Sequence, residues 1–257
     1  MSFAVAGDTY DSYMGRYSVR LAPLLVEFAG VEAPARAIDV GCGPGALAAE
    51  LAARLGAAAA VAAADPSESF VAACAERTLG ADVRLARAEQ LPWEDATFDA
   101  ALSQLVVNFM QDADAGVREM ARVVRPGGVV ASCTWEYRAG MKMLRTFWDA
   151  ALALDPAAPD EGRVMRFQDG DELARVWRDA RLGDVETAPL DVAVDYRDFD
   201  DYWLPFETGT GPGGTYCLSL SERDRATLRE ECRRRLGGPT GSFTLTARAW
   251  AVRGVKR

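Results

Sequence analysis

The chain has 257 residues, with 29 Lys and Arg against 38 Asp and Glu, a formal net charge of −9 and no histidine. The missing histidine excludes Ser-His-Asp and Cys-His hydrolases, and zinc or haem sites with histidine ligands. The acidic balance argues against duplex DNA or an anionic membrane as the main partner, because phosphate groups are bound by clustered Lys and Arg.

Short β-branched runs alternate with helical patterns over the first 135 residues. Helices are predicted over residues 45–55, after Pro66 and Ser67, and along the apolar stripe of residues 117–124. Arg125-Pro126-Gly127-Gly128 is expected to end this last helix. The predicted strands cover residues 35–40, 59–64, 81–86, 98–103 and 129–135. This alternation is typical of an α/β protein whose parallel sheet is covered by helices.

The remainder of the chain has a different pattern. Helices are predicted over residues 171–181 and 221–236, strands over 185–194 and 243–252, and a mobile glycine hinge over 209–214. Because no segment resembles an interdomain linker, we expect a single domain over residues 1–257. It divides into a cofactor-binding core (1–135), substrate-side helices with an insertion (about 136–236) and a final strand (237–257).

Cysteine usage and the N-terminus bear on location. The five cysteines are odd in number and none stand at CxxC spacing, so neither a disulfide framework nor a zinc knuckle is predicted. Residues 1–8 show no signal-peptide pattern, and the longest apolar stretch, 57–64, is too short to cross a bilayer. We therefore expect a cytoplasmic protein with reduced thiols and no metal.

The segment Ile38-Asp39-Val40-Gly41-Cys42-Gly43-Pro44-Gly45 leads from a strand through glycines into a helix. Glycine permits a tight turn and a close approach of backbone to ligand. Asp65 follows Gly45 by twenty residues, at the end of the second strand. A carboxylate there can accept hydrogen bonds from the two hydroxyls of a ribose. The combination predicts an adenosine-type cofactor across the carboxyl ends of the strands.

The glycine pattern alone also fits a dinucleotide, since Gly41-x-Gly43-x-x-Ala46 satisfies the looser form of that motif. A pyrophosphate needs open N–H groups and a positive helix end. Here Asp39 lies two residues before the first glycine, and Pro44 removes a backbone donor. Both features favour a sulfonium over a diphosphate, and therefore S-adenosyl-L-methionine over a nicotinamide cofactor.

These residues resemble the class I S-adenosylmethionine-dependent methyltransferases. Asp39 to Gly45 resembles their first signature, Asp65 the acid of the second, and Ala88-Glu89-Gln90-Leu91-Pro92-Trp93 before Phe98-Asp99 a third. Arg125-Pro126-Gly127-Gly128 matches the turn before their fifth strand. The segment Tyr13-Met14-Gly15-Arg16-Tyr17 is similar to small-molecule members of the ubiquinone/menaquinone methyltransferase-like group. Order and spacing are kept over residues 10–135.

The resemblance implies a Rossmann-like fold with a seven-stranded, mostly parallel sheet, helices on both faces and a small C-terminal cap. It implies S-adenosyl-L-methionine as cofactor and S-adenosyl-L-homocysteine as product. At position 87 this chain has Arg where many members of the family carry an acid. A guanidinium group cannot accept a hydrogen bond from the adenine amino group. The residues implied at the cofactor are Arg16, Tyr17, Asp39, Gly41, Gly43, Asp65, Pro66, Arg87, Ala88, Glu89, Ser103 and Gln104.

Aromatic residues at near-helical spacing between 196 and 206 are either the apolar face of a lid over a hydrophobic acceptor or ordinary core packing. The candidate acceptor-binding residues are Tyr13, Asn108, Trp135, Tyr202, Trp203 and Phe206. No catalytic base is predicted. Asp112, Asp198, Asp200 and Asp201 qualify by position alone, and solvated surface acids would look the same.

We therefore expect a methyltransferase that acts on a small, hydrophobic molecule by in-line transfer, without nucleic acid or membrane as partner. A cofactor-binding relative that catalyses another reaction, or acts as a partner protein, remains an alternative. For a nucleic-acid methyltransferase, Ser103-Gln104-Leu105-Val106 stands where an Asn/Asp-Pro-Pro-aromatic tetrad is expected. A nicotinamide oxidoreductase would call for the Tyr-x-x-x-Lys pair that the chain lacks. The oligomeric state is not predicted.

Overall fold

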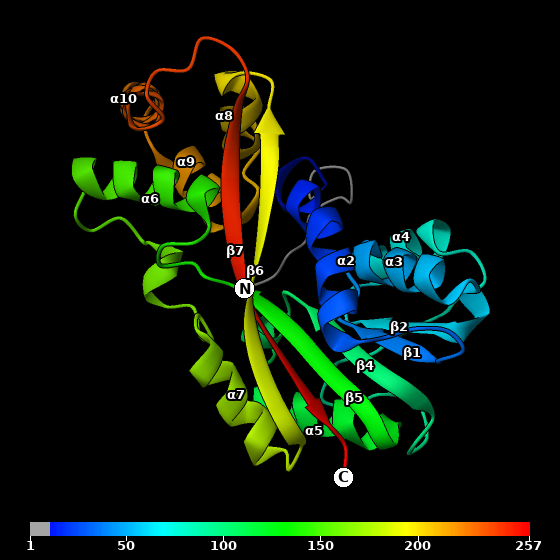
Figure 1. Cartoon of the computed structure of the whole chain (residues 1–257). Coiled ribbons are helices and arrows are strands. Elements are labelled where there is room, and N and C mark those ends of the chain that lie inside the picture. Colours follow the sequence, from blue (N-terminus) through cyan, green and yellow to red (C-terminus); the bar gives the residue numbers. More distant parts are fainter. Residues whose placement is uncertain (1–10) are drawn as a thin grey trace.

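The computed structural model describes residues 11–257, and its centre is a seven-stranded sheet of order β3-β2-β1-β4-β5-β7-β6 (Figure 1). Strands β1 to β5 are parallel, whereas β7 is antiparallel to both of its neighbours. The predicted mostly parallel sheet is thereby confirmed. The strands are β1 (Ala37–Val40), β2 (Val61–Asp65), β3 (Asp82–Leu85), β4 (Phe98–Gln104), β5 (Val124–Trp135), β6 (Gly183–Tyr196) and β7 (Phe243–Val255).

Helices cover both faces of this sheet. Strands β1 and β2 are buried along their whole length, which explains their unbroken apolar and alanine-rich sequences. One apolar cluster joins the sheet to α2 (Arg16–Ala29), α3 (Ala46–Leu55) and α4 (Glu68–Arg77). A second cluster, on the opposite face, joins it to α5 (Ala113–Val123) and α7 (Gly170–Asp179).

A cap stands above the carboxyl ends of the parallel strands. Strands β6 and β7 extend well beyond the rest of the sheet, and four helices gather around their upper parts (Figure 1). These helices are α6 (Lys142–Leu154), α8 (Phe199–Glu207), α9 (Gly211–Ser219) and α10 (Glu222–Arg235). Short helical turns lie at η1 (Asp11–Gly15), η2 (Ala58–Ala60), η3 (Val107–Phe109) and η4 (Glu161–Arg163). Among the helices described, none is both long and apolar enough to cross a membrane.

Helix α5 ends at Val123, just before the Arg125-Pro126-Gly127-Gly128 turn that was expected to end it, but the strand after it starts earlier than predicted. Strand β5 begins at Val124, before the Arg125-Pro126-Gly127-Gly128 turn, because Gly127 and Gly128 exchange backbone hydrogen bonds with Lys256 at the end of β7. Residues 211–214 form the first turn of α9, which begins at Gly211, so the mobility expected of the segment 209–214 stays a prediction. A Cβ on Gly214 would lie 2.5 Å from the carbonyl carbon of Gly209, so that glycine permits close packing.

Helices α2 and α6 were not predicted. Helix α2 carries its buried positions at helical spacing and ends in a left-handed Gly30. Helix α6 buries Phe147 and Trp148 among the other aromatic residues of the cap. Strand β6 and helix α7, both within residues 136–236, belong to the central sheet and its covering layer.

Candidate functional site

The glycine loop after β1 is a set of tight turns at the carboxyl edge of the sheet. Gly41, Gly43 and Gly45 have φ angles of 77°, 51° and 90°, a region that residues with a Cβ rarely adopt. The N–H groups of Gly41 and Cys42 both donate to the carbonyl of Ala64, at 2.7 and 3.0 Å. These bonds tie the loop to the end of β2 and aim it at the start of α3.

Asp65, the last residue of β2, is fixed at the rim of this loop. One carboxylate oxygen accepts from the Gly43 N–H at 3.0 Å and the other from the Ser67 N–H at 2.9 Å. Burial raises the pKa of Asp65, and the two backbone bonds act against that rise. Each oxygen retains acceptor capacity, so the carboxylate can still receive two ribose hydroxyls.

Asp39 is the least satisfied acid of the site. It is 1 % exposed, and neither carboxylate oxygen has a hydrogen-bond partner of good geometry among the described residues. Burial, then the nearby Cys74 and Asp65, raise its pKa well above the usual value, and the Ala48 N–H lowers it slightly. A cationic ligand would favour the ionised form.

Further buried polar atoms without partners lie at the end of β4, which pairs with β1. They are the Ser103 hydroxyl and the side-chain oxygen of Gln104. Native structures rarely leave such atoms unpaired. Together with Asp39 they fit a polar, partly cationic ligand lying over the glycine loop, as S-adenosylmethionine would.

Replacing Asp39 with Asn should raise the melting temperature near neutral pH. A raised pKa means that the folded chain holds a proton that the unfolded chain releases above about pH 4, so wild-type stability falls as pH rises through that window. Asn avoids this loss, and a gain of about 2–4 °C is expected for each kcal/mol recovered. Thermal melts of both proteins from about pH 4 to 7 test it. A difference that does not grow with pH would contradict the assignment.

A cleft of about 550 Å³ adjoins Asp65 at the ends of β2 and β3. Pro66 and Arg87 line it, and Arg87 is exposed with its guanidinium 3.7 Å from Glu89. Glu89 also accepts from the backbone N–H groups of Gln111 and Asp112, so it braces the segment after β4. The buried Ala88 lies between them. The structure thus places this group of predicted adenine-side residues together.

Arg16 and Tyr17 are directed toward the cap. The Arg16 guanidinium bonds Asp201 at 3.0 Å and lies over the ring of Tyr196, 4.6 Å from its centroid. The Tyr17 hydroxyl pairs with that of Tyr196 at 2.9 Å. Both side chains are engaged with residues of β6 and α8, and their role at the cofactor stays a prediction.

The predicted acceptor-binding aromatics of α8 pack inside the cap, where Tyr13 of η1 joins them. Phe206 stacks on Phe147 of α6, with ring centroids 4.2 Å apart, and meets Tyr13 edge-on at 5.6 Å. Tyr202 donates to the Met143 carbonyl, and Trp203 donates to Glu207. These side chains therefore belong to one packed core shared by η1, α6 and α8.

Trp135 and Asn108 approach the same region from the sheet. The Trp135 ring meets Tyr17 edge-on at 6.0 Å. The Asn108 amide nitrogen contacts the Met165 sulfur at 3.6 Å, and its oxygen has no partner among the described residues. Both side chains mark the carboxyl ends of β4 and β5 as the floor beneath the cap.

The four acids considered as bases have structural roles. Asp112 and Asp198 cap the N-termini of α5 and α8, with bonds of 2.9 Å to Ala115 and Asp201. Asp200 pairs with Arg229, and Asp201 pairs with Arg16. Helix capping and ion pairing account for all four acids without a catalytic role.

Sequence reasoning missed Glu161 and Gln168. Both are buried in the segment that joins α6 to α7, on which η4 forms. The Gln168 amide donates to the carbonyls of Gly162 and Met165, which folds this segment onto itself. The sequence here has neither helical nor strand periodicity, so no pattern pointed to these residues.

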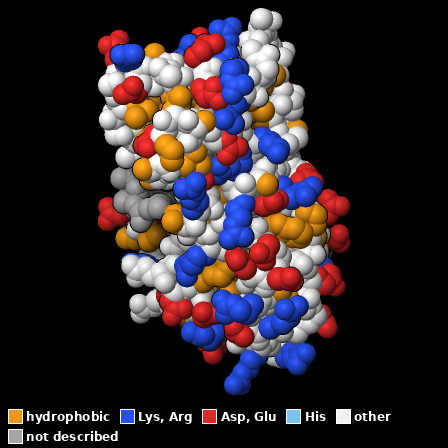
Figure 2. Space-filling view, turned by 90° about the vertical axis from the view of Figure 1, so that its left-hand side faces the viewer, with side chains coloured by type: hydrophobic (Ala, Val, Ile, Leu, Met, Phe, Trp, Pro, Cys, Tyr) orange, Lys and Arg blue, Asp and Glu red, His pale blue; other side chains and the backbone are white. Residues whose placement is uncertain are grey.

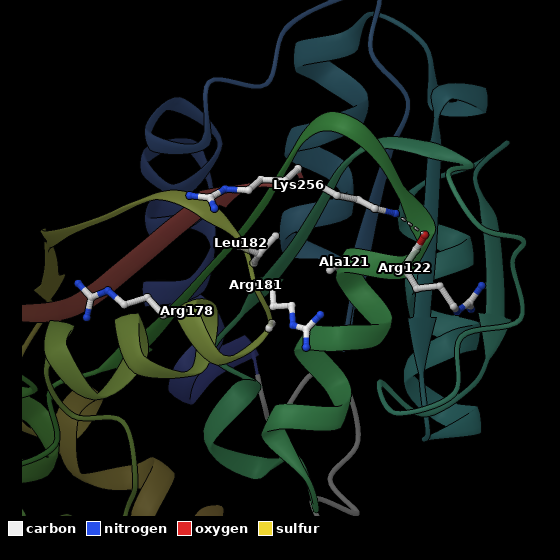
Figure 3. A pocket seen from close by; sticks show the side chains of 8 residues that line it. Ala121, Arg122, Arg178, Arg181, Leu182 and Lys256 are labelled. Atoms are coloured by element: carbon white, nitrogen blue, oxygen red, sulfur yellow. Dashed lines mark hydrogen bonds between the residues drawn. The ribbon is translucent and has the colours of Figure 1, made fainter.

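A second hollow, of about 730 Å³, lies at the opposite edge of the sheet (Figure 3). Although basic residues line it, the guanidinium groups of Arg122, Arg178 and Arg181 point in different directions, and Lys256 bonds the backbone carbonyls of Arg122 and Val124. The face drawn in Figure 2 mixes acidic and basic side chains, with hydrophobic ones in small separate areas. Neither feature rivals the carboxyl edge as a site.

Comparisons with known proteins agree with this geometry. A family model described as "Methyltransferase domain" matches residues 38–132. Malonyl-[acyl-carrier protein] O-methyltransferase of Pseudescherichia vulneris is 35% identical over 215 residues, which are 84% of this chain and 78% of that protein. A ubiquinone biosynthesis O-methyltransferase of Agrobacterium fabrum is 38% identical over 103 residues, 38% of this chain and 40% of that protein.

Similarity extends to solved structures. That of Haemonchus contortus phospholethanolamine N-methyltransferase 2, in complex with phosphomonomethylethanolamine and S-adenosylhomocysteine, has a TM-score of 0.57 and 16% identity. The match covers 100% of this chain and 60% of that one. At this identity the likeness concerns the fold.

Proposed function

Because the chain belongs to the S-adenosylmethionine-dependent methyltransferases, we propose that it methylates a small, apolar molecule held between the glycine loop and the cap. One observation carries this proposal. The aromatic core of Tyr13, Phe147 and Phe206 lies on the cap side of a site whose buried polar atoms lack partners. Small-molecule sites are lined mainly by apolar and aromatic side chains, with a few polar groups.

The roles of the residues around the cofactor follow from their positions. Asp65 would hold the ribose hydroxyls, and Gly41 and Gly43 would bring the backbone close to the methionine moiety. Ser103 and Gln104 would receive the ammonium end beside Asp39. Pro66 and Arg87 would border the adenine in the cleft that they line, with Ala88 and Glu89 behind it.

The cofactor, when bound, supplies a methyl group already activated on a sulfonium. The chain then has to position the acceptor in line and exclude water, for which it needs no histidine. The packed cap excludes water above the strand ends. The glycine loop and Asp65 fix the nucleoside below.

Calorimetric titration with S-adenosylmethionine, S-adenosylhomocysteine and NADH tests the cofactor. Transfer of a labelled methyl group to lipophilic hydroxyl, amine and carboxylate compounds tests the reaction. We expect both sulfur nucleosides to bind and NADH not to bind. Tight NADH binding without binding of either sulfur nucleoside would overturn the proposal.

Replacing Asp65 with Ala should weaken cofactor binding by about 1–3 kcal/mol, the cost of losing hydrogen bonds to a charged group. Asp95→Ala is the matched control, because Asp95 is an exposed acid paired with Arg122 away from the loop. Calorimetric titration of both variants measures the effect. Equal affinities for the wild type and Asp65→Ala would remove Asp65 from the site.

We also propose that the chain works as one domain in the cytoplasm, without nucleic acid or membrane as partner. All five cysteines are free and buried, which suits a reducing compartment. The net charge of −9 opposes binding to polyanions. Gel-shift and fractionation experiments test these points.

A further inference from the structure

Glu161 is a buried acid that the methyl-transfer proposal leaves without a role. It is 5 % exposed, and among residues 11–257 its carboxylate has one hydrogen bond, from the Trp148 indole N–H at 2.9 Å. Burying a carboxylate without full compensation is costly. A buried acid that is incompletely paired, next to a binding region, is a candidate for chemistry.

The two arginines near Glu161 form ion pairs with other acids. Arg145 bonds both oxygens of Asp160, at 2.9 and 3.0 Å, and also bonds Asp149. Arg163 faces Asp160 at 4.0 Å and is largely exposed. Among the described residues, Glu161 therefore has no ion pair, unlike Asp160 beside it, and Arg145 acts on it only without a direct bond.

The segment that carries Glu161 is docked on the floor of the site. Asn108, in η3 just after β4, contacts Met165, and the Thr134 hydroxyl near the end of β5 donates to the Phe167 carbonyl. Gln168 ties Met165 to Gly162, the neighbour of Glu161. These contacts place Glu161 above the carboxyl ends of β4 and β5.

Tyr13, in η1, enters the same buried region from the N-terminal side. Its hydroxyl is buried and has no partner among the described residues. Burial is the first cause that raises the pKa of Tyr13, and the charge of Glu161 is the second, which puts the two groups in electrostatic reach. The Tyr13 ring lies against Phe206, inside the aromatic core. Ring contacts also run from Tyr13 through Phe206 and Phe147 to Trp148, whose indole N–H bonds Glu161. The carboxylate and the phenol therefore belong to one aromatic core.

We propose that Glu161 is the catalytic base that takes the proton from a hydroxyl group of the acceptor, while the Tyr13 hydroxyl donates a hydrogen bond to the same oxygen. The inference rests on the methyl transfer proposed above and narrows the acceptor to an apolar alcohol or phenol. The acceptor oxygen loses its proton to Glu161 and uses the freed electron pair for the new bond to the methyl carbon. The cofactor sulfur keeps the pair of the broken carbon–sulfur bond. Glu161, now neutral, returns the proton to water.

The ionisation of Glu161 suits this role. Burial raises its pKa to about 7, Asp160 adds to the rise, and the Trp148 bond and Arg145 oppose it. Three further phenols, Tyr196, Tyr137 and Tyr17, lie near enough to Tyr13 to raise its pKa. A base with a pKa close to the working pH is effective. A carboxylate acceptor would need no base and would be repelled by Glu161.

Binding of three matched probes tests the inference in the chain saturated with S-adenosylhomocysteine. The probes are 4-methylphenol, its methyl ether 4-methylanisole, and 4-methylbenzoate, each followed by tryptophan fluorescence and calorimetry. The wild type should bind the phenol about tenfold more tightly than the ether, because only the phenol can donate a hydrogen bond to the charged Glu161. Glu161→Gln should lose that preference and bind 4-methylbenzoate more tightly than the wild type does. Glu32→Gln, at an exposed acid, should behave as the wild type.

Turnover of 4-methylphenol with labelled S-adenosylmethionine supplies the second readout. The wild-type rate should rise with pH through about 7. In Glu161→Gln the rate should no longer rise with pH in this range. Its kcat should fall about 100-fold or more, with a smaller change in KM. If Glu161→Gln fails to fold by its melting curve, Tyr13→Phe replaces it and should lose the phenol preference.

The outcomes separate the two proposals. If S-adenosylhomocysteine does not bind the wild type, the proposed function fails. If S-adenosylhomocysteine binds but the wild type does not prefer the phenol to the ether, only the role of Glu161 is overturned. The same holds if Glu161→Gln keeps both this preference and the rise of the rate with pH. A wild type that binds 4-methylphenol yet forms no methyl ether also overturns it.

Discussion

Replacing Gly41 with Ala is expected to disrupt the cofactor loop and lower the free energy of unfolding by about 2–5 kcal/mol. Two independent strains combine at this position. The φ angle of 77° disfavours any residue with a Cβ, and a Cβ built there lies 2.5 Å from a methyl carbon of Val106. Val106 belongs to the turn after β4, so relief of the clash would displace the end of that strand. Cofactor affinity should fall with stability.

Gly43→Ala is the matched control for this change. Gly43 also has a positive φ, 51°, but nothing lies within 4 Å of its Cβ position. It should therefore lose only the conformational part, about 1–2 kcal/mol. Urea unfolding gives the stability of each variant, and titration with S-adenosylhomocysteine gives its affinity. Equal losses for the two glycines would show that contact with Val106 does not matter.

Replacing Trp203 with Ala is expected to lower the free energy of unfolding by about 3–5 kcal/mol, the usual cost of emptying a large buried aromatic site. Trp203 is 1 % exposed and packs against Phe147, Phe199 and Phe206. Its loss should loosen α8 from α6 and impair acceptor binding through the cap. Because the glycine loop and Asp65 are held by other contacts, cofactor affinity in the folded protein should change less.

Two variants separate packing from direct contact with an acceptor. Trp203→Phe keeps an aromatic ring but removes the hydrogen bond to Glu207, and Leu204→Ala changes a neighbour that is 53 % exposed. Both should retain most of the stability. Thermal melts and acceptor titrations of the three variants give the result. If Trp203→Ala lost acceptor binding without a lower melting temperature, Trp203 would line the acceptor site instead of supporting the cap.

The two predictions concern the two halves of one site. The glycine loop is held by hydrogen bonds from its backbone N–H groups to Ala64 and Asp65, whereas the cap is held by packing between aromatic rings. Strain in the first half acts locally on the cofactor. A cavity in the second half acts on the cap as a whole.

The positions of some predicted cofactor residues follow from local sequence, and those of others do not. Asp65 and the glycines lie at a strand end whose local sequence fixes their geometry, so their placement could be predicted. Arg16, by contrast, bonds Asp201 of α8, a partner more than a hundred residues away in the chain. Nothing near Arg16 in the sequence indicates that it would bond to the cap.

The sequence by itself determined the α/β alternation, the glycine loop after β1 and the acid at the end of β2, because period, turn chemistry and strand ends are local properties. Only the tertiary structure decided that Asp200 and Asp201 pair with Arg229 and Arg16, and that Glu161 is buried against Trp148. Burial and pairing arise from contacts between distant segments, and no local pattern encodes them.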